Sequence, residues 1–284
     1  QELLKPISSD QDNKNFVINR TVDEFDFDEN EFLGSINYSF PISKISWLKV
    51  GGPVDVLFRP RNLDDLSRFL SLVPVEVNYM PIVACSNLLV RDGGLPGVAV
   101  KLGRNFSEIE VKDKQIKLGA GNFSSKVAIS LSELGYDLSF LRTIPGTIGG
   151  AIAMNAGCYG NYIGDYIRSV EGVDKSGKIN RLSKENLKFK YRCSRLPNGF
   201  IVTSAILKPK IEKKEAIKLK MKEMLSKMEQ THPTKKATCG STFKNPDGKS
   251  SLMLEESIDF KAVSYTHLRA HETGRNLVCR LLLE

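Results

Sequence analysis

Apolar and polar residues alternate over short stretches in the first part of the chain, around one amphipathic segment. β-Branched and aromatic residues at 45–50 and 54–58 predict two strands. Residues 62–72 predict a helix, because a capping residue is followed by acidic side chains and regularly spaced leucines. Further short apolar runs, separated by glycine or proline, lie at 79–84, 87–90 and 97–102. The pattern predicts a strand–helix–strand unit with a small sheet.

A second unit with the same mixture of elements follows. An apolar run at 115–121 predicts a strand, and residues 124–134 predict a helix that ends near Gly135. We expect three further strands, with a turn between the first two of them, near residues 167–173, 178–182 and 200–207.

Residues 211–230 carry the clearest helical pattern. Lysines occupy much of this segment, while apolar side chains recur on one face at helical spacing. These side chains are Ile217, Met221, Met224, Leu225 and Met228. The stripe predicts a helix packed on the core, and His232-Pro233 predicts its end.

Charge separates the first forty residues from the rest. Residues 1–40 hold nine acidic and three basic side chains, a balance of −6, so the other 244 residues carry +14. We expect residues 1–40 to form an acidic extension, either a loosely held arm or an extra helix. The positive remainder favours an anionic ligand: nucleic acid, a phosphorylated metabolite or a nucleotide cofactor.

Composition narrows the class of protein. With 41% hydrophobic and 26% charged residues, the 284-residue chain has an ordinary globular composition. No apolar run approaches the ~20 residues of a membrane span. The five cysteines are scattered without a CxxC motif, which favours a reduced, cytoplasmic protein. No signal sequence opens the chain, and Gln1 in place of Met is typical of a fragment.

Glycine-rich turns provide the main chemical signal. Gly51 and Gly52 follow a predicted strand directly, and residues 146–157 form a longer loop rich in glycine and alanine. Such residues let backbone N–H groups approach a pyrophosphate without a side-chain clash. Neither segment matches Walker A or GxGxxG, which disfavours a P-loop and a Rossmann site.

Six ordered motifs give a more specific indication. They lie at residues 49–53, 86–94, 144–151, 154–157, 191–194 and 240–246. Over residues 41–260 their order resembles that of the UDP-N-acetylenolpyruvoylglucosamine reductase (MurB) family. The resemblance implies an α+β fold, with a two-part FAD-binding domain of the vanillyl-alcohol-oxidase (PCMH) type and a smaller α+β substrate-binding domain, incomplete here.

The resemblance also implies a domain division and a set of ligands. The expected parts are the extension 1–40, the FAD-binding halves 41–114 and 115–209, the truncated substrate-binding domain 210–262, and a non-native tail 263–284. FAD is the implied cofactor and NADPH the reductant. The implied substrate is a UDP-sugar enolpyruvyl ether, and we expect a monomer with no nucleic-acid or membrane partner.

Motif position assigns the cofactor contacts. These are Val50, Gly51, Gly52, Pro53, Ser86, Asn87, Leu88, Gly146, Thr147, Gly149, Gly150, Asn155, Ala156 and Gly157. The same comparison assigns Tyr191, Lys244 and Asn245 to the substrate. No metal site is expected, because His267 and His271 have helical spacing but lack further ligands.

The reaction explains the two expected catalytic residues. Hydride addition to an enolpyruvyl double bond pushes charge onto the adjacent carboxylate, which a nearby cation stabilises. Arg192, in the Tyr-Arg-x-Ser motif, is that cation in the family pattern, and a guanidinium can fork onto a carboxylate. Ser241, preceded by Gly240, is the expected proton donor to the α-carbon.

Two departures from the family pattern affect these expectations. Ala84 and Cys85 stand where the family has a glycine-bearing turn, which narrows the backbone angles available before Ser86. The late catalytic glutamate of the family is also missing, since Glu255 and Glu256 come too early. We therefore expect the 284-residue chain to be weakly active or inactive.

Two other functions remain open on the sequence. The first is another FAD-dependent oxidoreductase of the same fold with a different substrate. The second is a basic module that binds nucleic acid, which only the positive charge favours. A Cys239–His232 nucleophilic pair is disfavoured by the proline beside His232. Flavin colour and substrate-dependent NADPH oxidation separate these readings.

Overall fold

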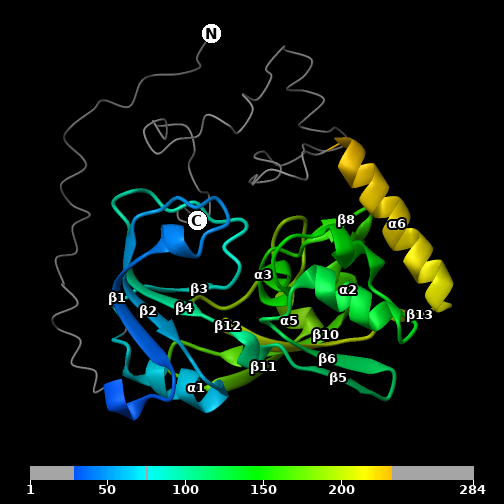
Figure 1. Cartoon of the computed structure of the whole chain (residues 1–284). Helices are drawn as coiled ribbons and strands as arrows, with labels where there is room; N and C mark the ends of the chain where they lie inside the picture. Colours follow the sequence, from blue (N-terminus) through cyan, green and yellow to red (C-terminus); the bar gives the residue numbers. More distant parts are fainter. Residues whose placement is uncertain (1–28, 75, 232–284) are drawn as a thin grey trace, which may run out of the picture.

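The computed structural model describes residues 29–74 and 76–231, and these form two sheets with helices around them (Figure 1). The first sheet has the strand order β1-β2-β4-β3. Its strands are β1 (Ser35–Pro41), β2 (Pro53–Arg59), β3 (Tyr79–Ile82) and β4 (Leu95–Lys101). β1 runs antiparallel to β2, whereas β2 and β3 both run parallel to β4.

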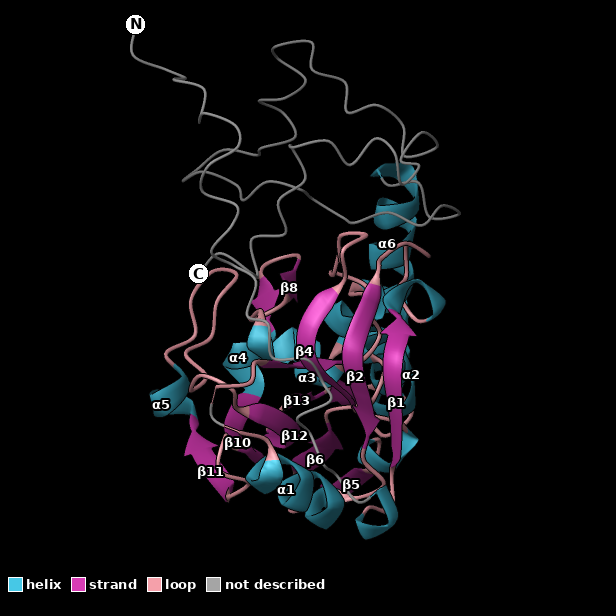
Figure 2. Cartoon of the chain, turned by 90° about the vertical axis from the view of Figure 1, so that its left-hand side faces the viewer, coloured by secondary structure: helices cyan, strands magenta, loops and turns pink. Residues whose placement is uncertain are grey.

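The expected strand–helix–strand unit is confirmed. β2 is followed by helix α1 (Leu63–Leu72), which leads to β3 at the opposite edge of the sheet. The side chain of Asn62 accepts a hydrogen bond from the Asp65 amide at 2.8 Å, and this cap starts the helix. α1 lies at the lower end of the first sheet, next to β10 and β11 of the second sheet (Figure 2).

The second sheet is antiparallel throughout and has the order β11-β10-β12-β6-β5. Its strands are β5 (Ile109–Lys112), β6 (Gln115–Gly119), β10 (Ile167–Val173), β11 (Ile179–Ser183) and β12 (Ile201–Leu207). The strands expected near 115–121, 167–173, 178–182 and 200–207 are confirmed. β5 pairs with β6, so the expected boundary between 114 and 115 cuts a hairpin of the second sheet.

Helices and small strand pairs complete the described part of the chain. The helices are α2 (Ser124–Ser132), α3 (Ile148–Ala153), α4 (Ile163–Tyr166), α5 (Lys184–Leu187) and α6 (Lys214–Thr231). The strand pairs are β7 (Tyr136–Asp137) with β13 (Lys210–Ile211), and β8 (Gly157–Cys158) with β9 (Asn161–Tyr162). Short 3₁₀ turns lie at Glu29–Glu31, Ile42–Lys44, Arg104–Phe106 and Ser139–Thr143. No described helix is long and apolar enough to cross a bilayer.

Two expectations near the N-terminus are wrong. Residues 45–50 form turns instead of a strand, because the amides of Ile45 and Ser46 bond back to Ile42 and the Ser46 hydroxyl bonds to Val50. Residues 35–40 are neither a loose arm nor a helix, since they belong to β1. Just before β1, Phe32 packs edge-on against Phe58 and Phe69.

Alternating side chains on the first sheet face two separate cores. Val56 and Phe58 enter the larger core, which also contains the inner side chains of the second sheet. Leu57 and Ala99 enter a smaller core with Ile42, Cys85 and Val90. Successive side chains of a strand point to opposite faces, so the smaller core packs the loops 42–53 and 83–94 onto the outer face of the first sheet.

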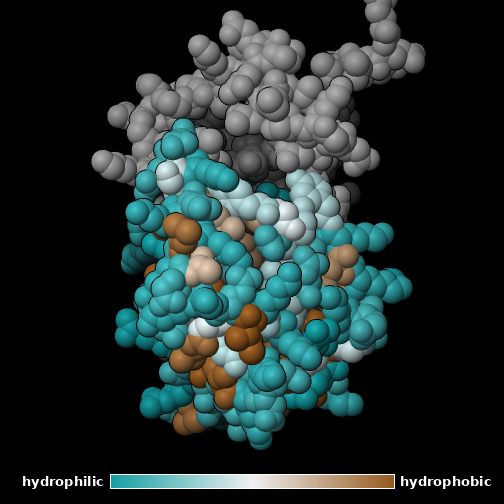
Figure 3. Space-filling model, turned by 90° about the vertical axis from the view of Figure 1, so that its right-hand side faces the viewer, coloured by the Kyte–Doolittle hydropathy of each residue, from teal (hydrophilic) through white to brown (hydrophobic). Residues whose placement is uncertain are grey.

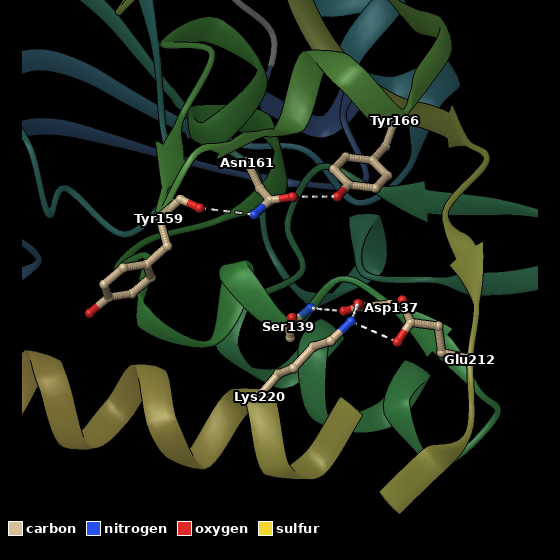
Figure 4. Close-up of polar contacts among 7 residues, drawn as sticks. All are labelled: Asp137, Ser139, Tyr159, Asn161, Tyr166, Glu212 and Lys220. Atoms are coloured by element: carbon tan, nitrogen blue, oxygen red, sulfur yellow. Dashed lines mark hydrogen bonds and ion pairs between the residues drawn. The ribbon is translucent and has the colours of Figure 1, made fainter. Parts of the chain in front are cut away.

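Helix α6 is fixed to the second half of the structure by polar contacts (Figure 4). Lys220 forms ion pairs with Asp137 at 2.7 Å and Glu212 at 2.6 Å. One turn further along, the Tyr159 hydroxyl donates to the Met224 carbonyl at 3.0 Å. The expected apolar stripe is buried at Ile217 and Met221. The side of the molecule that carries α6 is mainly hydrophilic (Figure 3).

Replacing Asp137 with asparagine is expected to lower the free energy of unfolding at pH 7 by about 1–3 kcal/mol, because the substitution breaks a charge-assisted hydrogen bond. Burial alone raises the pKa of Asp137, but the hydrogen bonds from Lys220 and Ser139 outweigh burial and hold it below its ordinary 3.8. The stabilisation is therefore present above that pH and is lost as the pH falls through the folded-state pKa. Urea unfolding of both proteins from pH 7 down to pH 3 measures this difference.

Glu133→Gln is the matched control for this experiment. Glu133 pairs with Lys214 and Lys218 of the same helix, but its side chain is 45% exposed. Exposed ion pairs contribute little to stability, so this variant is expected to unfold almost like the parent protein. A difference for Asp137→Asn that stays constant from pH 7 to pH 3 would contradict the assignment.

Candidate functional site

Two loops of the first half pack against each other at the end of the first sheet (blue and teal in Figure 1). The Gly52 amide donates to the Arg91 carbonyl at 3.0 Å. A Cβ on Gly52 would lie 2.1 Å from the Asp92 carbonyl oxygen, and Gly51 has φ +123° beside Val90. Both glycines are therefore required for the contact between loops 42–53 and 83–94, whatever ligand these loops hold.

Gly52→Ala is expected to weaken cofactor binding and to lower the melting temperature, because the loops must separate to admit the methyl group. Overpacking of this kind costs about 1–3 kcal/mol. Gly93→Ala is the matched control from the adjoining loop, since a Cβ there meets nothing within 4 Å. Calorimetric titration with FAD and thermal unfolding compare the variants, and equal behaviour of the two would disprove the packing role.

The two halves of the structure meet at Ser86 and Gly146. Gly146 has φ +92°, and a Cβ there would lie 2.8 Å from the Ser86 hydroxyl oxygen. Asn87 is exposed beside this contact, while Leu88 packs against the smaller core. The structure thus brings together two motifs that are 60 residues apart in the sequence and were both expected to contact the cofactor.

The glycine-rich segment after Gly146 is a short helix, α3, although the sequence predicted a loop. The amides of Ile148 and Gly149 donate to the carbonyls of Asn122 and Ala120, both at 2.9 Å. These two amides are consequently occupied by the protein. Gly149 packs closely on Ala120, since a Cβ would lie 3.0 Å from the Ala120 Cβ. The turn at 119–122 is therefore part of the site, and its Gly-Ala-Gly-Asn sequence was the available signal.

Gly150 differs from its neighbour because it is exposed and no residue in the described part of the chain lies close enough to require a glycine there. The nearest atom to a Cβ would be the Thr147 hydroxyl oxygen at 3.9 Å. Open space at a glycine, next to the Ser86–Gly146 contact, is the geometry that lets a ligand approach the backbone closely. The residues present therefore fit a nucleotide cofactor lying between the two loops and α3.

Tyr191 and Arg192 occupy the tip of a tight hairpin. The backbone groups of Lys190 and Cys193 exchange two hydrogen bonds of 2.9 and 3.1 Å. Arg192 is exposed with φ +56°, and its guanidinium carbon lies 5.8 Å from the centroid of the Tyr191 ring. The expected substrate contact and the expected cation therefore project together from one turn.

The motif at 154–157 supports this hairpin. The Asn155 side chain donates to the Lys190 carbonyl at 2.9 Å and accepts from the Gly164 amide at 3.1 Å. Ala156 is buried, and a Cβ on Gly157 would overlap the Tyr162 ring. All three residues were expected to contact the cofactor, and in the structure Asn155 and Ala156 are buried while Gly157 has no room for a side chain beside Tyr162.

Residues 83–85 form the turn before Ser86 without the glycine that the family pattern has there. Cys85 is buried and adopts φ +48°, in the region that favours glycine. Lys101 donates a hydrogen bond from its ammonium group to the Val83 carbonyl and so fixes the segment before Ser86. Burial lowers the pKa of Lys101 and raises that of Cys85. Lys101 was not among the residues expected from the sequence, where it is the one charged residue of the apolar run 97–102.

A hollow of about 410 Å³ adjoins the hairpin. Aromatic, basic and acidic side chains line it together with Asn155 and Gly164: Tyr162, Asp165, Lys184, Phe189, Lys190 and Tyr191. Lys184 already donates to the Asp165 carbonyl at 3.1 Å, and the Asp165 carboxylate accepts from the Tyr162 amide at 3.2 Å. Its polar groups thus serve in part to join α4 and α5.

Several expected site residues lie outside the described part of the chain. These are Ser241, Lys244 and Asn245, together with His232, Cys239, Glu255, Glu256, His267 and His271. Within residues 29–74 and 76–231, no three histidine, cysteine, aspartate or glutamate side chains form a metal-binding group.

Comparison with known proteins adds independent findings. A family model described as an FAD binding domain matches residues 54–183. The UDP-N-acetylenolpyruvoylglucosamine reductase of Ruegeria pomeroyi is 44% identical over 224 residues, covering 79% of this chain and 73% of that protein. The enzyme of the same name from Paracoccus denitrificans is 39% identical over 245 residues, covering 85% and 80%.

Solved structures agree with these matches. The crystal structure of UDP-N-acetylenolpyruvylglucosamine reductase (MurB) from Thermus caldophilus is similar with a TM-score of 0.69 and 30% identity, and the match covers 80% of both chains. The Physcomitrella patens protein BBE-like 1 is similar in fold alone, with a TM-score of 0.51 and 16% identity over 64% of this chain and 43% of that one. The expected α+β fold with an FAD-binding domain is confirmed.

Proposed function

Because this chain belongs to the UDP-N-acetylenolpyruvoylglucosamine reductase family, we propose that it reduces UDP-N-acetylglucosamine enolpyruvate to UDP-N-acetylmuramate with NADPH as reductant. The product is a precursor of peptidoglycan. The observation that supports this most is the continuity of the site: Ser86 lies against Gly146, and Asn155, just beyond the helix that follows Gly146, is hydrogen-bonded to the hairpin that carries Tyr191 and Arg192.

We place FAD beside the two loops and α3, where Gly150 is exposed. Residues 50–53 and 86–88 of the first half, with Gly146, Thr147 and Gly150 of the second, would hold it. When bound, FAD accepts hydride from NADPH and passes it to the β-carbon of the enolpyruvyl group. Gly52 keeps the two loops in contact, and Lys101 keeps the segment before Ser86 in place.

Arg192 stabilises the charge that develops on the substrate carboxylate. A guanidinium remains protonated and presents two N–H groups in one plane, so it can bind both carboxylate oxygens. Its exposed position at the hairpin tip leaves these groups accessible to a substrate. The adjacent Tyr191 ring limits the orientations of the guanidinium and offers a surface for the sugar nucleotide.

Ser241 donates the proton that completes reduction at the α-carbon, and Lys244 and Asn245 bind the UDP-sugar. These residues belong to the segment 210–262 that we assign to the substrate-binding domain, whose described part is β13 and α6. The enzyme acts as a cytoplasmic monomer, and neither nucleic acid nor a membrane is its partner.

Purification and half-reaction kinetics test the proposal. The purified protein is expected to show flavin absorbance, to lose it anaerobically on addition of NADPH, and to regain it only slowly on addition of UDP-N-acetylglucosamine enolpyruvate, because the late glutamate of the family is missing from this sequence. A colourless protein that does not bind FAD in calorimetric titration would overturn the flavoenzyme. A protein reduced by NADPH but not reoxidised by this substrate would point to another oxidoreductase of the same fold.

A further inference from the structure

We propose that Asn155 is a positioning residue for Arg192, and that its side chain is not a cofactor contact. The inference rests on the proposed function, since it assigns Asn155 a role in the substrate step of that reaction. It begins with the hairpin itself. Tyr191 and Arg192 have exposed side chains at a two-residue tip, so the hairpin has to be held through its base.

Two side-chain hydrogen bonds hold that base to the end of α3. Asn155 Nδ2 donates to the Lys190 carbonyl at 2.9 Å on one strand. Ser194 Oγ donates to the Ala153 carbonyl at 2.7 Å on the other. Ala153 is the last residue of α3 and Asn155 lies two residues beyond it, so both strands of the hairpin are fixed at the same end of this helix.

Both the backbone conformation and the side-chain hydrogen bonds of Asn155 suit an asparagine at this position. It has φ +42°, a conformation that asparagine tolerates better than other non-glycine residues, and it is 6% exposed. Its Oδ1 accepts from the Gly164 amide at 3.1 Å. A carbonyl only accepts and an amide N–H only donates, so these partners determine which end of the side chain faces the hairpin.

Gly164 supplies the space for this arrangement. A Cβ on Gly164 would lie 2.8 Å from Asn155 Oδ1 and 2.6 Å from the Phe189 ring, which precedes the hairpin. The amide of Asn155 is thus enclosed between α4 and the hairpin. Because Gly150 and Asn155 stand on and just after the same short helix, α3 sets the distance between the cofactor and the guanidinium of Arg192.

Two substitutions of Asn155 separate its two hydrogen bonds. Asn155→Asp keeps an acceptor for the Gly164 amide but sets a carboxylate against the Lys190 carbonyl, while Asn155→Ala removes both bonds. Flavin reduction by NADPH is expected to stay within about twofold of the parent protein in both variants. Reoxidation by the enolpyruvyl substrate is expected to slow by roughly 10- to 100-fold, because a small misplacement of a catalytic group has that effect.

The pH profile provides a readout that a purely structural role would not change. A protonated aspartate can again donate to the Lys190 carbonyl, so reoxidation of Asn155→Asp is expected to recover as the pH falls. The Asn155→Ala variant lacks this recovery. Ser194→Ala, which removes the other anchor, is expected to slow the same step to a smaller extent.

Asn161→Ala is the matched control. Asn161 also uses both ends of its amide, with the Tyr159 carbonyl at 3.1 Å and the Tyr166 hydroxyl at 2.9 Å (Figure 4), and neither of these partners belongs to the hairpin. This variant is expected to reoxidise at the parent rate. Weaker FAD binding by the Asn155 variants, with unchanged reoxidation of the bound flavin, would overturn the proposal and make Asn155 a cofactor contact.

Limited digestion with trypsin tests the same contact without the reaction. Cleavage after Arg192, measured by mass spectrometry, is expected to be faster in Asn155→Ala than in Asn161→Ala, because the hairpin is released from α3. Equal cleavage rates would overturn the proposal. If the parent protein does not react with the enolpyruvyl substrate, the proposed function fails, and this digestion still decides whether Asn155 holds the hairpin.

Discussion

Ser241→Ala is expected to leave flavin reduction by NADPH intact and to slow reoxidation by the enolpyruvyl substrate by about 10²- to 10⁴-fold. General acid catalysis by a positioned side chain contributes accelerations of that size. In the proposed mechanism Ser241 donates the proton to the α-carbon and takes no part in hydride transfer to the flavin. Anaerobic stopped-flow measurement of the two half-reactions separates these steps.

Cys239→Ala is the control for Ser241. It lies two residues away in the same segment and carries the thiol that a nucleophilic mechanism would need. This variant is expected to reoxidise normally. Normal reoxidation of Ser241→Ala would show that the serine is not the proton donor. Slow reoxidation of Cys239→Ala would indicate that the Cys239 thiol takes part in the reaction.

Arg192→Gly is expected to slow reoxidation by about 10²- to 10³-fold, the loss found when one charge-stabilising group of an active site is removed. Glycine suits the φ of +56° at this position, so the hairpin keeps its backbone conformation. Reduction by NADPH is expected to be unchanged. Added guanidinium ions are expected to restore part of the reoxidation rate. Such a rescue would show that the variant lacks the positive charge and is not misfolded.

The neighbouring Arg195→Gln variant is the control, because Arg195 is also exposed and follows the same hairpin. It is expected to react at the parent rate. Equal rates for Arg192→Gly and the parent protein would show that the guanidinium takes no part in the substrate step.

The sequence predicted the elements with a continuous apolar run or an apolar stripe at helical spacing. β2 and β12 are such runs and are buried along most of their length, and α1 and α6 bury one face. The prediction failed where local hydrogen bonds outweigh residue preference: the turn at 45–50 is closed by the Ser46 hydroxyl, and α3 forms in spite of two glycines. β1 was missed because the residues before it are acidic, although Ile36, Tyr38 and Phe40 alternate with polar residues along it.

For the candidate site, motif positions selected residues of which the fold brings several together, but they did not predict the contacts that those residues make. Ser86 and Gly146 do come together, whereas Gly52 and Asn155 are used to join protein segments. Such roles depend on contacts between residues far apart in the chain, which periodicity does not encode. Lys101 was missed for the same reason, since only the fold brings its ammonium group to the Val83 carbonyl.

The smaller core under loops 42–53 and 83–94 gives those loops a stability of their own. It shares the first sheet with the larger core but lies on the other face, so it can open while the larger core remains folded. A ligand that binds the closed loops shifts the equilibrium between the open and closed forms of the smaller core toward the closed form by mass action. Substitutions that weaken the smaller core are therefore expected to cause loss of the bound ligand while the rest of the chain stays folded.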